Sequence, residues 1–124
     1  MIMLNSAVKG KVDGHLSSEQ LENLANLLEQ FADHPVLLAC HHHPFAMKSK
    51  WIDHHKLQNS NALLDTLSPF QNVKALVCGH VHQDSLNIWQ GIEFFLHLPQ
   101  VYNLSRLVMI LHSTKMRRVI VTFV

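Results

Sequence analysis

Histidine is the feature of this sequence that points most directly to chemistry, because its 124 residues hold eleven histidines against ten Lys and Arg together. Two histidine clusters each follow an apolar run. His41, His42 and His43 come directly after Cys40, and His80 and His82 follow Cys78 and a glycine. In an extended chain the rings of His80 and His82 lie on one side, which suits two ligands of one metal or of adjacent metals. We therefore expect a metal site, for which iron, manganese and zinc are all compatible with imidazole.

Other interpretations exist for single residues of these clusters. One histidine beside a strand is usually a hydrogen-bonded surface or core residue, but two clusters at equivalent positions favour metal binding. Cys40 and Cys78 cannot form a disulfide framework, and we expect them to be small apolar strand residues in a reduced chain. His54 and His55 follow Trp51 in a polar loop, where they are either solvated or directed at a substrate.

The elements that must position these histidines follow from the apolar runs. Val36–Cys40 and Val73–Cys78 are continuous and apolar, as expected for strands buried on both faces. Ala62 to Leu67 predicts a short helix between them, so the three segments form a crossover unit with parallel strands. Because the carboxyl ends of parallel strands meet at one edge of a sheet, we expect both histidine clusters to face one crevice.

The rest of the chain supports an α/β fold. Met1 to Leu4 predicts that the chain opens inside a strand, and Ser17 with Gln20 forms a capping box before a helix with an apolar stripe that ends at Phe31. Apolar residues then alternate on both sides of Gln90-Gly91, which predicts a hairpin.

Composition limits the classes of function. Hydrophobic residues make up 48% of the chain and charged residues 15%, which fits one packed domain. A net charge of +1 supplies no field for nucleic acid or an anionic membrane. The apolar runs are far shorter than the roughly 18 to 20 residues that span a bilayer. We found no leader sequence, so we expect a cytoplasmic protein.

Gly79-His80-Val81-His82, with an upstream His42-His43-Pro44, resembles the calcineurin-like metallophosphoesterases. An ordered set of further segments is similar to the bacterial class III 3',5'-cyclic AMP phosphodiesterases, and this resemblance runs from about Met1 to about Phe95. The segments are Gly14-His15-Leu16-Ser17, His41-His42-His43-Pro44-Phe45, Trp51-Ile52-Asp53, Leu57-Gln58-Asn59, Cys78-Gly79-His80-Val81-His82-Gln83 and Trp89-Gln90-Gly91.

This resemblance implies a fold, a reaction and a set of residues. The fold would be the C-terminal half of a four-layer α/β/β/α sandwich. The reaction would be hydrolysis of cyclic AMP to 5'-AMP at two metals, commonly iron and manganese, bridged by an Asp and by a hydroxide that attacks phosphorus. His42 and His80 match ligands of one metal and His82 matches a ligand of the other, while His41 and His43 flank the ligand. The loop that begins at Trp51 would border the nucleotide pocket, with Trp51 and His54 binding the substrate.

The chain also departs from the family. Asp-x-His, Gly-Asp and Gly-Asn-His-Asp belong upstream of the matching segment and are missing, and with them the bridging Asp and the leaving-group His. Asp13-Gly14-His15 and Asp53-His54-His55 fit the first pattern by letters only, because each sits in a polar loop. We therefore expect an enzyme half that is inactive without its N-terminal half. The alternatives are a non-catalytic metal-binding fragment and a non-functional remnant.

Residues 1–95 form the predicted partial phosphoesterase domain, and residues 96–124 form an atypical tail. The family continues with a pattern like A-P-S-T-x-x-Q-F-K-P and later P-G-x-R. If each shifted codon takes the third base of one residue and the first two of the next, Leu96 to Leu107 can encode APSTGIQFKPF. By the same rule Lys115 to Phe123 can encode NAPGYRYL. This predicts out-of-frame translation of the tail, and the alternative is an ordinary strand pair ending with Val119–Val121.

Overall fold

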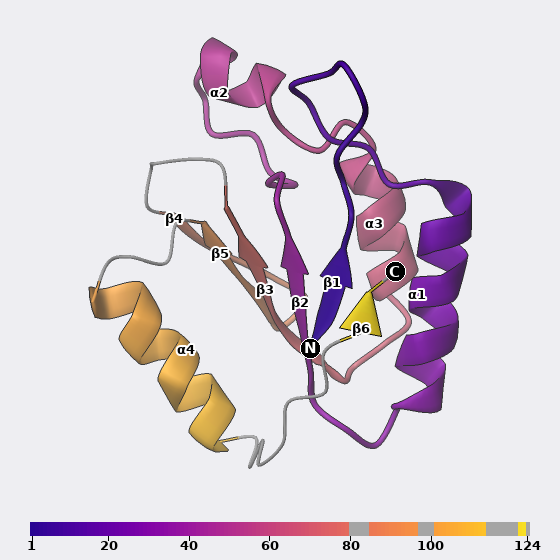
Figure 1. Ribbon diagram of the computed structural model, residues 1–124. Coiled ribbons are helices and arrows are strands. Elements are labelled where there is room, and N and C mark those ends of the chain that lie inside the picture. The colour runs from indigo at the N-terminus through magenta and orange to yellow at the C-terminus, as the bar shows by residue number, and fades with distance from the viewer. Residues whose placement is uncertain (80–84, 97–100, 114–121, 124) are drawn as a thin grey trace.

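A mixed β-sheet with helices on both faces forms the centre of the protein (Figure 1). The computed structural model describes residues 1–79, 85–96, 101–113 and 122–123. Within these residues the sheet has six strands in the order β4-β5-β3-β2-β1-β6, and only β4 runs antiparallel to its neighbour. The strands are β1 (Ile2–Leu4), β2 (Val36–Cys40), β3 (Val73–Cys78), β4 (Ser85–Trp89), β5 (Ile92–Leu96) and β6 (Thr122–Phe123). The helices are α1 (Ser18–Gln30), α2 (Lys50–His54), α3 (Ser60–Leu67) and α4 (Val101–Ser113).

The crossover predicted from the two apolar runs is confirmed. β2 and β3 are parallel neighbours, and their register pairs Leu38 with Leu76 and Cys40 with Cys78. Leu38 and Leu76 are fully buried, as expected for central strands covered on both faces. Both strands end at the same edge of the sheet, so the segments that follow them start side by side.

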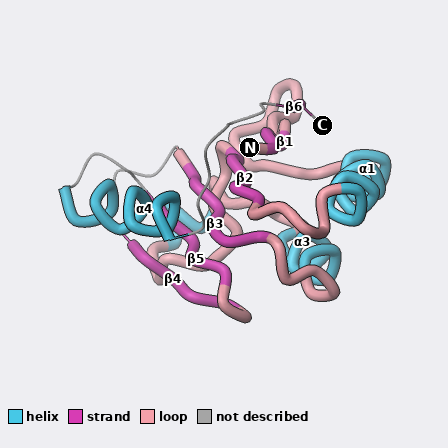
Figure 2. Tube along the Cα trace, turned by 90° about the horizontal axis from the view of Figure 1, so that it is seen from below, coloured by secondary structure: helices cyan, strands magenta, loops and turns pink. Residues whose placement is uncertain are grey.

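Helices α1 and α3, both predicted from the sequence, cover one face of the sheet (Figure 2). Ser17 caps α1, because its Oγ accepts from the backbone N–H of Gln20 at 3.1 Å. Leu24 and Leu28 of α1 are fully buried in the core on this face, together with Leu63 and Leu67 of α3.

The predicted hairpin is also confirmed. β4 and β5 pair antiparallel, with Trp89 opposite Ile92. The two residues between them have positive φ, 48° for Gln90 and 77° for Gly91. This is the combination that a two-residue type I′ turn requires, and its twist matches that of the strands.

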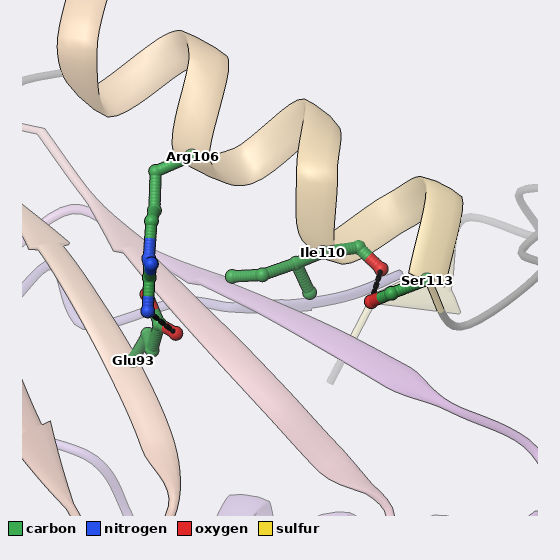
Figure 3. A network of polar contacts seen from close by, with 4 residues as sticks. All are labelled: Glu93, Arg106, Ile110 and Ser113. Carbon is green, nitrogen blue, oxygen red and sulfur yellow. Dashed lines mark hydrogen bonds and ion pairs between the residues drawn. The ribbon is translucent and has the colours of Figure 1, made fainter.

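Helix α4 packs on the opposite face of the sheet and was not predicted (Figure 2). Leu107 is buried against Ala75 and Phe95. The guanidinium of Arg106 donates to both carboxylate oxygens of Glu93, each at 2.8 Å, and near the end of the helix Ser113 Oγ donates to the carbonyl of Ile110 (Figure 3). Apolar residues also lie on the exposed side of α4, where Met109 is 65% exposed. Because apolar residues lie on both the buried and the exposed sides of α4, the sequence shows no helical period there.

Two further expectations concern the last predicted strand and membrane spans. The final strand predicted at Val119–Val121 lies outside the described residues, although Thr122 and Phe123 form β6 beside β1. Among the described helices, none is long and apolar enough to cross a membrane.

The hairpin turn gives a test of backbone conformation alone. A Cβ at Gly91 would meet no atom within 4 Å, so a side chain there costs only the strain of its positive φ. We expect Gly91→Ala to lower the free energy of unfolding by about 1 kcal/mol in urea titrations. Gly79→Ala is the matched control, because a Cβ there makes an ordinary 3.5 Å contact with His41. Equal effects of the two substitutions would contradict this assignment.

Candidate metal site

His42 lies just beyond the end of β2 and is buried, with 5% of its surface exposed. Its Nδ1 is 2.7 Å from Ser6 Oγ, and its Nε2 is 3.2 Å from the carbonyl oxygen of Val12. Because a carbonyl oxygen can only accept, Nε2 carries the hydrogen in this arrangement and the Ser6 hydroxyl donates to Nδ1. The backbone N–H of His42 also donates to Ser6 Oγ, at 3.4 Å. The ring is therefore held in a single orientation.

Gly14 leaves the space that the His42 ring occupies. A Cβ at Gly14 would lie 2.5 Å from His42 Cγ, which is closer than real contacts allow. Two hydrogen bonds hold the backbone of Gly14. Its N–H donates to the carbonyl of Lys56 at 3.1 Å, and its carbonyl accepts from the backbone N–H of Gln58 at 2.8 Å. The N–H of Leu57 donates to the carbonyl of His43 at 2.9 Å. Three loops far apart in the sequence thus enclose this histidine.

Asn59 ties the same loops together through its side-chain amide. Its Oδ1 accepts from the N–H of Leu16 at 3.0 Å, and its Nδ2 donates to the carbonyl of Leu16 at 2.7 Å. The amide thereby satisfies both backbone groups of a buried residue and links the start of α3 to the loop that contains Gly14.

The three consecutive histidines differ in their surroundings. His41 is exposed, and its ring meets the ring of His42 edge to face with centroids 4.9 Å apart. His43 is fully buried. Of the three, His42 is the one enclosed by Ser6, Val12 and Gly14.

The other two predicted metal ligands, His80 and His82, lie outside the described residues. Gly79, just before them, is exposed at the edge where β2 and β3 end. In the part of the chain that the structure describes, no group of three or more His, Cys, Asp or Glu side chains is arranged to hold a metal ion. The ligand roles of His42, His80 and His82 therefore stay predictions.

Trp51 and His54 lie in α2, which the sequence had placed in an irregular polar loop. That prediction was wrong, because Asp53 stabilises a short helical turn: its Oδ1 accepts from the N–H of Met47 at 2.6 Å. Trp51 is 74% exposed, and its ring meets the ring of His55 at a centroid distance of 4.6 Å. His54 is also exposed, with its ring 5.7 Å from that of His55. Asp53 thus has a structural role that its Asp-x-His spacing does not indicate.

Cys40 and Cys78 are buried free thiols in the core, as expected. Burial raises the pKa of Cys40, partly offset by its hydrogen bond with Ser6. Burial also raises the pKa of Cys78 well above its ordinary value, with a smaller contribution from the nearby Cys40. Both thiols are therefore neutral at neutral pH.

Sequence patterns missed Ser6 as a partner of His42. They lie 36 positions apart in the sequence, so no local pattern connects them. Gly14 and Asn59 lie in segments that resemble the phosphodiesterases. The sequence did not predict that Gly14 leaves space for the His42 ring or that the Asn59 amide hydrogen-bonds the backbone of Leu16.

Comparison with solved structures identifies the fold. A dimetal phosphatase from Danio rerio superposes with a TM-score of 0.59 at 23% identity, over 67% of this chain and 27% of that structure. The fold is thus an α/β fold that matches part of a dimetal phosphatase, as the resemblance implied. No protein-family model matches the chain.

Curated proteins of similar sequence indicate the family to which this part of the chain is related. The 3',5'-cyclic adenosine monophosphate phosphodiesterase CpdA of Haemophilus influenzae is 39% identical over 92 residues, which are 74% of this chain and 34% of the relative. CpdA of Escherichia coli K12 is 40% identical over 91 residues, covering 73% and 33%. A 3',5'-cyclic-nucleotide phosphodiesterase of Nostoc is 40% identical over 83 residues, covering 67% and 31%. The chain is a homologue of part of the bacterial cyclic AMP phosphodiesterases, and it spans about a third of their length.

The close approach of Gly14 to His42 gives the first test at the site. We expect Gly14→Ala to lower the free energy of unfolding by about 1 to 3 kcal/mol, because the new methyl group overlaps the imidazole. It should also shift the NMR signals of the His42 ring. Asp13→Ala is the control, since it changes the neighbouring residue without entering this space. Unchanged His42 signals in the Gly14 variant would contradict the enclosure.

The raised pKa values of the two thiols give a second test. At pH 8 a raised pKa leaves less thiolate, and the thiolate is the form that reacts with iodoacetamide. We expect alkylation of the native chain to be much slower than in urea, where both cysteines recover ordinary pKa values and full exposure. Mass spectrometry after timed quenching measures both rates. Equal rates in the two conditions would show that the thiols are accessible and unperturbed.

Proposed function

We propose that this chain is the C-terminal metal-binding portion of a phosphodiesterase that hydrolyses 3',5'-cyclic AMP to 5'-AMP in the cytoplasm. The observation that carries the proposal is the position of His42, held rigidly at the carboxyl edge of β2 beside the strand that leads to His80 and His82. Identities of 39% and 40% to cyclic AMP phosphodiesterases support the same substrate.

The donor set suits a pair of metal ions. His42, His80 and His82 supply imidazole nitrogens, which bind iron, manganese and zinc. When bound, such metals polarise the phosphoryl oxygens and stabilise the leaving oxygen. The partners of His42 allow this role. If the ring hydrogen moves to Nδ1, Nδ1–H can donate a hydrogen bond to Ser6 Oγ. Nε2 then has a free lone pair that can bind a metal in place of its contact with the Val12 carbonyl. Ser6 then orients the ligand in both states.

Trp51 and His54 are the proposed substrate-binding residues. α2 stands over the edge where β2 ends (Figure 1), and the exposed Trp51 ring offers a flat apolar surface on which a purine base can stack. His54 follows three residues later, on the same side of the helix, and can donate a hydrogen bond to the substrate. His55 supports the Trp51 ring from its edge.

The proposed reaction needs groups that this sequence does not carry. The bridging Asp and the leaving-group His belong to motifs upstream of the matching third of the relatives, so we propose that the chain is inactive without a companion N-terminal half. A non-catalytic metal-binding fragment and a non-functional remnant are the competing possibilities.

A phosphodiesterase assay tests the proposal. The purified chain with manganese or iron should not hydrolyse cyclic AMP. Addition of a companion segment with the Asp-x-His and Gly-Asn-His-Asp motifs should restore turnover, and His42→Gln should abolish it because a ligand is lost.

The outcomes of this assay separate the alternatives. Stoichiometric manganese or zinc on the chain without turnover in any combination would indicate a metal-binding fragment. Neither binding nor turnover would indicate a remnant. Sustained turnover by the chain alone would contradict the proposal.

We also propose that residues 1–95 are the phosphoesterase portion and that residues 96–124 are translated out of frame. The family-like sequence that the shifted frame can encode supports this, as does the match to a probable cyclic nucleotide phosphodiesterase of Psychrobacter, which covers 77% of the chain. The alternative is an ordinary strand pair ending with Val119–Val121. The helix α4 and the bidentate pair of Arg106 with Glu93 give residues 101–113 a packed, helical structure in place of the first of these strands.

The coding DNA decides between the two. We expect the codons of residues 96–107 and 115–123 to spell the family pattern in the second frame. Codons incompatible with APSTGIQFKPF and NAPGYRYL would rule out the shifted frame.

A further inference from the structure

Strand β4 forms one outer edge of the sheet (Figure 2). Among the described residues no strand pairs with its outer side. Charged residues, prolines and short length are the features that normally keep an edge strand from pairing with another chain. The five residues of β4 include neither a charge nor a proline. The opposite edge is β6, which has only two residues. β4 is therefore the edge that can accept a further strand.

The side chains of β4 alternate between the two faces of the sheet. Leu86 packs in the cluster beneath α4, and Ile88, two residues later, lies on the same face. Trp89 packs against the core on the opposite face. Ile88 is 64% exposed, so it is the apolar side chain that a further strand would cover.

A second copy of β4 fits this edge by symmetry. Two identical edge strands related by a two-fold axis perpendicular to the sheet run antiparallel, and side chains of the same face meet. The register centred on Asn87 pairs all five residues of both strands. It places Leu86 of each copy opposite Ile88 of the other, so two apolar pairs form on the α4 face. Such directly opposite apolar pairs stabilise antiparallel strands.

Charge does not oppose this contact. A two-fold axis brings identical groups together, so like charges near it would repel across the junction. β4 itself is uncharged. On the neighbouring strand β5, Glu93 lies opposite Ile88, and its carboxylate forms a bidentate pair with Arg106 of α4. The charge closest to Ile88 in this ladder is thus compensated within each chain.

We propose that β4 pairs with β4 of a second copy and that the chain forms a symmetric dimer with one continuous sheet. Each copy uses its β4 edge once, so the assembly closes at two chains. Because β2 and β3 run antiparallel to β4 through β5, the two carboxyl edges point in opposite directions. Each copy therefore keeps its own histidine site.

Cysteine cross-linking tests the register. Asn87 lies opposite its counterpart, with Cβ atoms about 4.5 to 5.5 Å apart, so Asn87→Cys should form a disulfide-linked dimer under mild oxidation. Ser85→Cys is the matched control, because it removes the same hydrogen bond between Asn87 and Ser85. Its counterpart lies four residues along the strand, about 14 Å away, so it should run as a single chain on a non-reducing gel. The buried Cys40 and Cys78 are present in both variants.

A charge at the edge tests the strength of the contact. Sedimentation equilibrium should show the wild-type chain reaching the mass of two chains as concentration rises. Ile88→Lys should raise the dissociation constant at least about tenfold, because it removes both apolar pairs and places two cations near the axis. Val108→Lys is the matched control. Val108 is also exposed, at 44%, but it lies two residues after Arg106 and so on the other side of α4. It should leave the constant unchanged.

Circular dichroism shows whether each variant keeps the native fold, and Ile88→Thr replaces Ile88→Lys if the lysine variant does not. A wild-type chain that stays monomeric at every concentration would overturn the proposal. Equal cross-linking of the two cysteine variants, or unchanged dimerisation of the Ile88 variant, would do the same. Because mass and cross-linking are measured without turnover, these results do not depend on the proposed phosphodiesterase function.

Discussion

The in-register parallel pairing of β2 with β3 is the constraint on which the rest of the site depends. It ends both strands at the same level, so the histidine-bearing segments that follow begin from adjacent positions. Helices α1 and α3 on one face and α4 on the other keep these strands buried, which makes a shift in register costly because every core side chain would change faces. The placement of these segments thus relies on the apolar packing of the strands that precede them.

The immediate surroundings of His42 are built differently, from loops and not from regular elements. Ser6 and the carbonyl of Val12 hydrogen-bond the ring. The backbone of residues 56–58 bonds the backbone of Gly14 and His43, and Gly14 leaves the space that the ring fills. Hydrogen bonds at both ring nitrogens specify the orientation of the ring, whereas apolar packing mainly specifies volume.

The sequence predicted the elements whose burial has a simple period. β2 and β3 are continuous apolar runs, α1 has a clear stripe after a capping serine, and the β4–β5 hairpin turns at Gln90-Gly91. It did not predict α2, whose turn depends on one carboxylate bonded to a backbone N–H six residues earlier in the chain. It also missed α4 and the partnership of Ser6 with His42. Both depend on contacts with distant segments, and such contacts leave no local pattern.

Asn59 shows how a single amide can make a structure sensitive to chemical ageing. Its side chain offers one acceptor and one donor to the two backbone groups of Leu16, which matches them as a neighbouring strand would. Deamidation would replace the donor by a second oxygen, which would then face the Leu16 carbonyl, and two acceptors repel each other at that distance. The loop enclosing His42 would loosen although no residue in contact with that ring had changed. Slow hydrolysis of one side chain could therefore limit the working lifetime of the site.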